Sequence, residues 1–201
     1  MKKITALLTL ATVVTGVCAQ TPVWLDPKVN QENEERAVAN YFAYESVEQA
    51  EKADKYSSSR FMSIEGDWRF NFVENANERP ENFYAVGYDD SKWDMFPVPG
   101  LFEMNGYGDR IYVNVGYVWR NQFDNNPPFV EERNNYVGSY RQNFTIPADW
   151  KGEKVYIHIG SATSNLKVWV NGKYVGYSED SKMAAEFDIT DYVEFGKPNL
   201  I

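Results

Sequence analysis

The side chains in this sequence that could bind a small polar ligand stand in two short stretches. Asp180 lies in the polar stretch Tyr177–Lys182. Asn114 stands in the middle of the β-prone run Arg110–Tyr117, although asparagine is depleted in strands. A carboxylate can accept hydrogen bonds or bind a cation, and an amide can both donate and accept hydrogen bonds. Taken alone, Asp180 is more typical of a residue that caps a turn, and Asn114 of a bulge or strand end.

The other candidate groups are poorly arranged for catalysis. His158 is the only histidine, and no cysteine or second histidine can join it in a metal site once an N-terminal signal has been removed. The carboxylates of Glu131-Glu132 and Asp89-Asp90 are adjacent in the chain, and neighbouring loop residues usually point apart into water. These residues therefore do not indicate metal or acid-base chemistry.

A β-hairpin must position Asp180, because the hairpin ends where the polar stretch begins. Two alternating runs between Leu166 and Tyr177 are separated by Asn171-Gly172, the pair that most easily adopts the positive φ angles of a two-residue turn. This turn sets the register of the strands. We expect two cross-strand pairs on opposite surfaces, Val168 with Val175 and Trp169 with Tyr174. The second pair is expected to serve packing rather than sugar stacking.

Further alternating segments recur at short intervals, separated by Pro, Gly and Asn. They are Gly66–Phe72, Lys92–Phe96, Tyr140–Ile146, Glu153–Ile159 and Glu186–Thr190. No convincing long helix interrupts them, and the prolines in Asn125–Phe129 favour an extended loop. This pattern predicts an all-β fold, an antiparallel β-sandwich of the jelly-roll type. Leu200-Ile201 resembles the start of a further strand, so we expect a fragment of a longer protein.

The first 19 residues have the features of a secretory signal peptide. Lys2-Lys3 precedes an apolar run from Ile4 to about Val14, which is too short to span a bilayer as an ordinary helix, and small residues follow. We expect cleavage after Ala19 and export to the periplasm or cell envelope. Lipoprotein processing at Cys18 is the alternative.

Residues 20–60 are expected to be an irregular N-terminal segment before a domain at 61–201. The segment has no sustained apolar face with helical period. It would lie against the domain through four aromatic residues, Trp24, Tyr41, Phe42 and Tyr44. A flexible leader is the alternative.

Charge limits the range of partners. The chain has 20 basic and 29 acidic residues and a formal charge of −9, and loss of Lys2 and Lys3 with the signal would make the charge −11. This balance argues against nucleic acid and anionic membrane surfaces as partners. Aromatic residues make up 16% of the chain, which suits both β-rich domains and sugar sites.

Several stretches, taken in order, resemble the N-terminal sugar-binding domain of family 2 glycoside hydrolases, the β-galactosidase branch in particular. The matching stretches are Glu65–Phe70, Val98–Phe102, Ile111–Val115, Asn126–Val130, Gly138–Arg141 and Asn165–Thr190. The resemblance implies a galactose-binding-domain-like jelly roll, followed in the whole protein by immunoglobulin-like domains and a (β/α)₈ barrel. The two glutamates of retaining hydrolysis would lie in that barrel, together with a magnesium site, so this chain would contain no catalytic residue.

The same resemblance implies roles for two residues of this chain. Asp180 would accept hydrogen bonds from galactosyl hydroxyls and help to hold a sodium ion, and Asn114 would reach the same galactosyl group. The partners would be β-galactoside sugars and the missing C-terminal domains, and the full-length protein would be a homo-oligomer. Lys182 stands where an arginine is usual and lacks its planar fork, which leaves a supporting role at that position in doubt.

Three functions remain open from the sequence. The first is the N-terminal domain of an exported β-galactosidase. The second is a free-standing carbohydrate-binding module, which would bind sugar by itself. The third is a family 2 enzyme with another specificity, such as a β-glucuronidase or a β-mannosidase.

Overall fold

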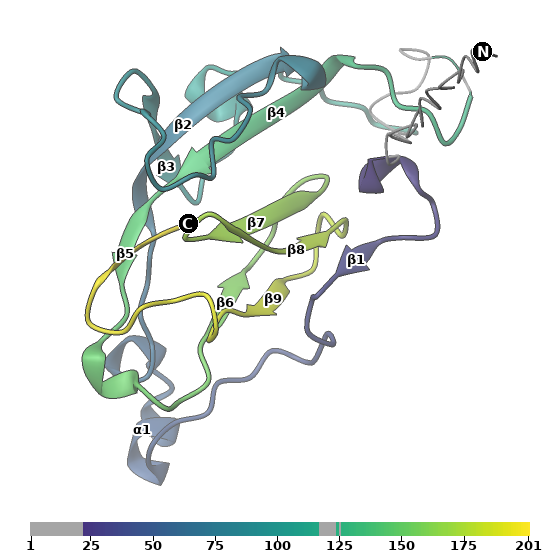
Figure 1. Ribbon diagram of the computed structural model, residues 1–201. Helices are drawn as coiled ribbons and strands as arrows, with labels where there is room; N and C mark the ends of the chain where they lie inside the picture. The colour runs from purple at the N-terminus through teal and green to yellow at the C-terminus, as the bar shows by residue number, and fades with distance from the viewer. Residues whose placement is uncertain (1–21, 117–123, 125) are drawn as a thin grey trace, which may run out of the picture.

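A computed structural model of the chain describes residues 22–116, 124 and 126–201 (Figure 1). The signal peptide expected at residues 1–19, Cys18, Tyr117 and Asn125 lie outside the described residues. The β-strands are β1 (Gln31–Glu32), β2 (Gly66–Asn75), β3 (Asp94–Val98), β4 (Arg133–Arg141), β5 (Asn143–Thr145), β6 (Tyr156–Ile159), β7 (Leu166–Val170), β8 (Lys173–Ser178), β9 (Ala185–Asp188) and β10 (Pro198–Leu200).

Strands dominate the described part of the chain, and all pairings between the named strands are antiparallel. The helical elements are short: α1 (Val47–Lys52) and five 3₁₀ turns at Val23–Leu25, Lys55–Ser57, Ala76–Glu78, Glu103–Asn105 and Ala148–Trp150. No helix among the described residues is long and apolar enough to cross a membrane. The predicted all-β antiparallel sandwich is confirmed.

One layer is the sheet β3-β2-β4, which lies above the other strands in Figure 1. Trp68 and Phe70 alternate with more exposed residues along β2, as the period of a half-buried strand requires. β3 begins two residues later than the predicted segment at 92 and continues through Pro97. The prolines do not end it, because β3 is an edge strand and Pro97 needs no partner on its outer side.

Aromatic rings fill the inner face of this layer. The ring centroid of Phe70 lies 4.5 Å from that of Phe96, 4.9 Å from that of Tyr107 and 4.8 Å from that of Tyr140. Phe102 stacks on Tyr140 with an interplanar angle of 17°. Packed aromatic pairs stabilise a core by about 0.5–1.5 kcal/mol each beyond the area that they bury. They attach the segment that follows Leu101 firmly to the sheet.

A buried arginine fixes the connection between β2 and β3. Arg141 is 4% exposed, and its Nε donates to Asp90 at 2.6 Å. Its Nη1 donates to the backbone carbonyls of Phe83 and Ala85. Since the charge and several N–H donors are satisfied together, the arginine can be buried at β4 without an unpaired group.

The second layer is built from the pairs β7-β8 and β6-β9, with β10 pairing β5 beside it. Its core is a cluster of buried apolar side chains from these strands and from the residues that flank them: Phe144, Ile146, Trp150, Val155, Ile157, Val168, Val170, Val175, Ala185, Phe187 and Ile189. On β6, exposed Tyr156 and His158 alternate with buried Ile157.

The hairpin of β7 and β8 has the predicted turn but not all of the predicted register. Asn171 and Gly172 have φ angles of +51° and +81°, as a two-residue turn of this kind requires. Trp169 pairs with Tyr174, which is confirmed, whereas Val168 pairs with Gly176 and not with Val175. A β-bulge inserts Val175 as an extra residue and shifts the pairing beyond it.

The physical reason for the bulge is that β8 is covered on both faces. Residues 175–178 are all buried, so the simple alternation is lost there. A Cβ atom on Gly176 would lie 2.5 Å from the carbonyl oxygen of Glu32 and 2.5 Å from the ring of Phe187. The position therefore needs a glycine, because the backbone of Glu32 in β1, which pairs with β8, lies against it.

The N-terminal segment meets the second layer through β1. Gln31 and Glu32 pair with Ser178 and Tyr177 of β8, and the side chain of Asn33 donates to the carbonyl of Val175 at 2.9 Å. This pairing covers the outer edge of β8. Earlier in the segment, the amine of Lys167 lies 4.6 Å from the ring centroid of Trp24.

The four aromatic residues expected to anchor the N-terminal segment behave differently from one another. Phe42 lies 4.8 Å from Tyr44 and 5.9 Å from Phe61 between ring centroids, and Trp24 is half-buried. Tyr41 is 79% exposed, so the anchoring expected of it was wrong. Its side chain points away from the domain, because this irregular segment has no regular apolar face that would direct the side chain inward.

The side-chain amide of Asn171 joins the hairpin turn to β10. Its Nδ2 donates to the carbonyl of Tyr192 at 2.8 Å and to the Oδ1 of Asn199 at 2.7 Å, and its Oδ1 accepts from the N–H of Leu200 at 2.9 Å. Asn199 is 2% exposed and also accepts from the N–H of Glu194. One residue thus forms the turn and fixes the last strand.

Asn171→Gly tests this network because glycine keeps the positive φ of the turn while removing the amide. The N–H of buried Leu200 would lose its acceptor, so we expect the free energy of unfolding to fall by about 2 kcal/mol. Urea unfolding followed by tryptophan fluorescence measures it. Asn134→Gly is the control, since Asn134 has a φ of +60° and its side chain makes no hydrogen bond within the described part of the chain. Equal losses in the two variants would contradict the network.

Candidate sugar-binding site

Two loops emerge together at one end of the second layer. The pairing of β6 with β9 ends at Ile159 and Ala185, and the pairing of β7 with β8 ends at Leu166 and Ser178. The connection 160–165 and the connection 179–184 therefore leave the sheets at the same end. Both carry mainly small and polar residues, among them Asp180.

Asp180 is exposed and caps the turn that contains it. Its Oδ1 accepts from the backbone N–H of Lys182 at 3.0 Å and of Met183 at 3.2 Å. No hydrogen bond or ion pair within residues 22–116, 124 and 126–201 involves its Oδ2. The turn-capping function and a ligand function are thus compatible, because each uses a different oxygen.

Asn114 lies in a segment that does not form the expected strand. No strand is assigned over residues 110–116, and Asn114 is exposed. Its Oδ1 accepts from the hydroxyl of Tyr112 at 2.9 Å. The β-prone residues of this run are exposed instead of paired: Tyr112 is 87% exposed and Val115 is 81% exposed. Propensity alone did not decide the structure here, because residues 110–116 pair with no strand of the described part of the chain.

The segment before Asn114 is tied to the first layer. The Tyr107 hydroxyl donates to Asp94 of β3 at 2.9 Å, and the Tyr136 hydroxyl of β4 donates to Asp109. The hydrogen bond to Asp109, together with burial, raises the pKa of Tyr136 from 10.0 to about 12. Asn114 therefore lies five residues after Asp109, which is anchored to the first layer.

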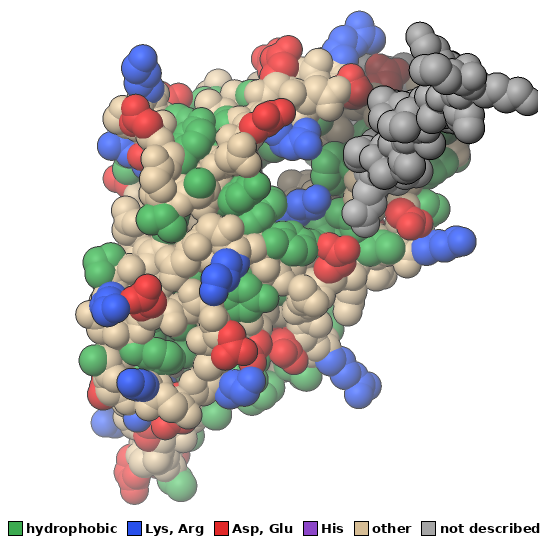
Figure 2. Space-filling model, in the orientation of Figure 1, with side chains coloured by type: hydrophobic (Ala, Val, Ile, Leu, Met, Phe, Trp, Pro, Cys, Tyr) green, Lys and Arg blue, Asp and Glu red, His purple; other side chains and the backbone are tan. Residues whose placement is uncertain are grey.

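Asn114 and Asp180 lie on separate layers, and no hydrogen bond joins them among the described residues. Neither residue lines the large cleft between the layers, although their neighbours Gly116 and Lys182 do. Figure 2 shows an opening between the upper and lower parts of the molecule. The cleft has a volume of about 3170 Å³, well above the range of about 300–1,000 Å³ for small-molecule pockets. It is the space between the layers, not a sugar-sized pocket.

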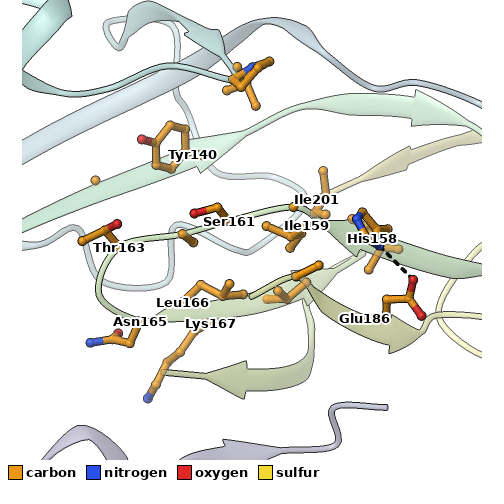
Figure 3. A pocket seen from close by; sticks show the side chains of 18 of the residues that line it. Tyr140, His158, Ile159, Ser161, Thr163, Asn165, Leu166, Lys167, Glu186 and Ile201 are labelled. Carbon is orange, nitrogen blue, oxygen red and sulfur yellow. Dashed lines mark hydrogen bonds and ion pairs between the residues drawn. The ribbon is translucent and has the colours of Figure 1, made fainter. Parts of the chain in front are cut away.

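The other sequence candidates are occupied by contacts within the protein. Nδ1 of His158 lies 2.8 Å from Oε1 of Glu186 across β6 and β9, and both side chains are among those that line the cleft (Figure 3). Tyr84 stacks on Trp169 at 5.3 Å and 6°, which confirms that Trp169 serves packing. Asp90 is paired with Arg141.

A cation site on this chain would have to be a partial one. No group of three or more His, Cys, Asp or Glu side chains that could hold a metal occurs within the described ranges. The exposed Oδ2 of Asp180 is a hard oxygen ligand that fits sodium or another oxygen-seeking cation. Its further ligands would be backbone carbonyls, water or groups from elsewhere in the protein.

The family profile described as "Glycosyl hydrolases family 2, sugar binding domain" matches residues 61–201. This chain belongs to glycosyl hydrolase family 2. A β-galactosidase of Priestia megaterium is 41% identical over 180 residues, covering 89% of this chain, and one of Halalkalibacterium halodurans is 39% identical over 178 residues, covering 88%. The chain spans 17% of the length of each of these two relatives.

A solved family 2 member from Bacteroides cellulosilyticus is 25% identical, with a TM-score of 0.48 over 70% of this chain and 17% of that one. The β-galactosidase large subunit of Leuconostoc lactis is 35% identical over 185 residues, covering 85% of this chain and 29% of that subunit.

Sequence reasoning missed the residues that hold the segment leading to Asn114 and the turn that carries Asp180. Tyr136 and Ser161 make long-range hydrogen bonds to Asp109 and to Ser181. No spacing or period along the chain indicates either contact. The only sequence signal was the polar composition of 160–165, which is common in loops.

The Tyr136 contact gives a stability test with a defined pH dependence. The folded protein keeps a proton that the unfolded chain loses above pH 10.0, so the stabilisation is fully present below that pH and is lost as the pH rises through about 12. We expect Tyr136→Phe to be about 1 kcal/mol less stable than the wild type at pH 7, with the difference shrinking above pH 10.

Urea unfolding at a series of pH values measures this difference. Tyr156→Phe is the control, because Tyr156 of β6 is 50% exposed. A Tyr136→Phe variant as stable as the wild type at pH 7 would contradict the assignment, as would a loss that is the same at pH 7 and pH 12.

Proposed function

We propose that this chain is the N-terminal sugar-binding domain of an exported β-galactosidase that removes terminal β-galactosyl residues. Membership of family 2 and the similarity to proteins named β-galactosidase over most of this chain support the proposal. The observation that carries it in the structure is that Oδ2 of Asp180, on an exposed turn, has no hydrogen-bond partner among the described residues. The two catalytic carboxylates of retaining hydrolysis belong to the part of the enzyme beyond these residues.

In this proposal Asp180 supplies one oxygen to the galactosyl site. Its Oδ1 keeps the turn in shape through the N–H groups of Lys182 and Met183, and its Oδ2 accepts from a sugar hydroxyl or binds a sodium ion. A charged acceptor contributes more than a neutral one, typically about 1.5–3 kcal/mol. The side chain thereby favours a hydroxylated ligand at the edge of a site that other domains complete.

Asn114 would contribute an amide to the same sugar. Its segment is exposed and anchored at Tyr107 and Asp109, so it can reach beyond the sheet toward a neighbouring domain. Because Asn114 and Asp180 lie on separate layers, we propose that the remaining domains of the same chain bring a sugar between them. The further proposals are a magnesium site in the catalytic domain, export to the periplasm or cell envelope, and a homo-oligomeric enzyme.

Asp180→Ala in the full-length enzyme tests the function. We expect kcat/KM for a chromogenic β-galactoside to fall about a hundredfold, since roughly 3 kcal/mol of charged interaction would be lost. Dependence on sodium concentration should weaken in the same variant. Asp89→Ala is a matched control, because Asp89 is an exposed aspartate whose Oδ1 caps a turn by accepting from Ser91 at 3.0 Å. Wild-type kinetics in Asp180→Ala would contradict the proposal.

The native gene product separates the alternatives. An antibody against residues 20–201 is compared with an in-gel galactoside stain of an envelope extract. We expect one band, several times larger than this chain, that coincides with the stain. A band of this chain's own size without stain would indicate a free-standing carbohydrate-binding module. A large band that stains only with a glucuronide or mannoside would indicate another family 2 specificity.

A further inference from the structure

The turn that carries Asp180 is hydrogen-bonded to the connection between β6 and β7. The hydroxyl of Ser161 donates to the backbone carbonyl of Ser181 at 2.8 Å. In return, the hydroxyl of Ser181 approaches the carbonyl of Ser164 at 3.5 Å, a distance at which a hydrogen bond contributes little. The first bond is therefore the one that fastens the two loops to each other. Figure 3 shows Ser161 on this connection, between Ile159 and Thr163.

The carbonyl that Ser161 contacts belongs to the same peptide unit as the N–H that Asp180 accepts. The unit between Ser181 and Lys182 offers its C=O to Ser161 and its N–H to Oδ1 of Asp180 at 3.0 Å. A peptide unit is planar and nearly rigid, so fixing its carbonyl also fixes the direction of its N–H. Hydrogen bonds in series through one amide also polarise one another. The orientation of the Asp180 carboxylate thus depends on a hydroxyl from another loop.

Sheet pairing explains why Ser161 is in place to do this. β6 pairs with β9 and β7 pairs with β8, so the two connections leave the same end of the layer. Ser161 follows β6 by two residues, and Asp180 follows β8 by two residues. The strands set the distance between the two connections, and the hydroxyl of Ser161 bridges that distance with its hydrogen bond to Ser181.

We propose that Ser161 is a positioning residue for Asp180, acting through the peptide unit Ser181–Lys182 to aim Oδ2 at the sugar. The inference rests on the proposed function of Asp180. Without this hydroxyl the turn moves more freely about its two ends. Oδ2 then spends a smaller fraction of the time oriented toward the sugar. Ser161 is exposed and lies outside the core, so its truncation leaves the fold intact.

A double-mutant cycle in the full-length enzyme tests the coupling. Ser161→Ala is expected to lower kcat/KM for a β-galactoside about three- to tenfold, mainly through KM, which corresponds to the loss of one ordinary hydrogen bond. In the Asp180→Ala background the same change should have no further effect. Ser161→Thr keeps the hydroxyl and should restore activity to within twofold of the wild type. Equal losses from Ser161→Ala in both backgrounds would overturn the proposal.

Hydrogen exchange provides a readout that does not depend on catalysis. The N–H of Lys182 should exchange several-fold faster in Ser161→Ala than in the wild type, because its carboxylate acceptor is less well held. Ser57→Ala is the matched control, as Ser57 is an exposed serine whose hydroxyl donates to the carbonyl of Asp54 at 2.7 Å. Unchanged exchange at Lys182 would overturn the positioning role even in an active enzyme. Faster exchange together with full activity of Asp180→Ala would leave the contact standing and refute the function proposed for Asp180.

Discussion

The side-chain amide of Asn171 is the interaction on which the second layer depends. It occupies the left-handed position of the hairpin turn and at the same time makes hydrogen bonds to Tyr192, Asn199 and Leu200. Asn199 in turn uses its amide on Glu194 and Lys197, so a buried polar network is fully satisfied. Such a network specifies one arrangement of the chain, because a shift of any member would bury an unpaired group. Hairpin and final strand are therefore fixed to each other.

The arrangement of the second layer determines where its polar loops lie. The antiparallel pairs β6-β9 and β7-β8 project two connections from one end, while the aromatic core of the first layer holds the segment that leads to Asn114. Many of the apolar residues of the strands are buried in these two cores. Exposed polar groups on short loops remain as the parts of the domain able to contact a ligand.

Local chemistry made much of the fold predictable from the sequence. The positive φ of Asn171-Gly172, the alternation along β2 and β6 and the absence of a helical period each follow from residues close together in the chain. The bulge at Val175 did not follow, because it lies where the backbone of Glu32 packs against Gly176, and these two residues are more than 140 positions apart in the chain. The run at 110–116 was misjudged because β propensity has no effect without a strand to pair with.

The candidate site was predictable only in part for the same reason. Residue type and the resemblance to a family identified Asp180 and Asn114 as candidate ligands. Two features could be identified only from the three-dimensional structure. One is that Oδ1 of Asp180 is the oxygen that caps the turn, and the other is the hydrogen bond from Ser161 to the carbonyl of Ser181. The structure places Asn114 in the segment anchored to the first layer and Asp180 on a loop of the second layer, and no local pattern in the sequence indicates this separation.

The most direct test of the account is a structure of the full-length enzyme with a galactosyl ligand in its active site. We expect Oδ2 of Asp180 within hydrogen-bond distance of a sugar hydroxyl or in contact with a bound sodium ion, while Oδ1 keeps the N–H groups of Lys182 and Met183. A ligand held entirely by other domains, with Asp180 facing bulk water, would contradict the central claim.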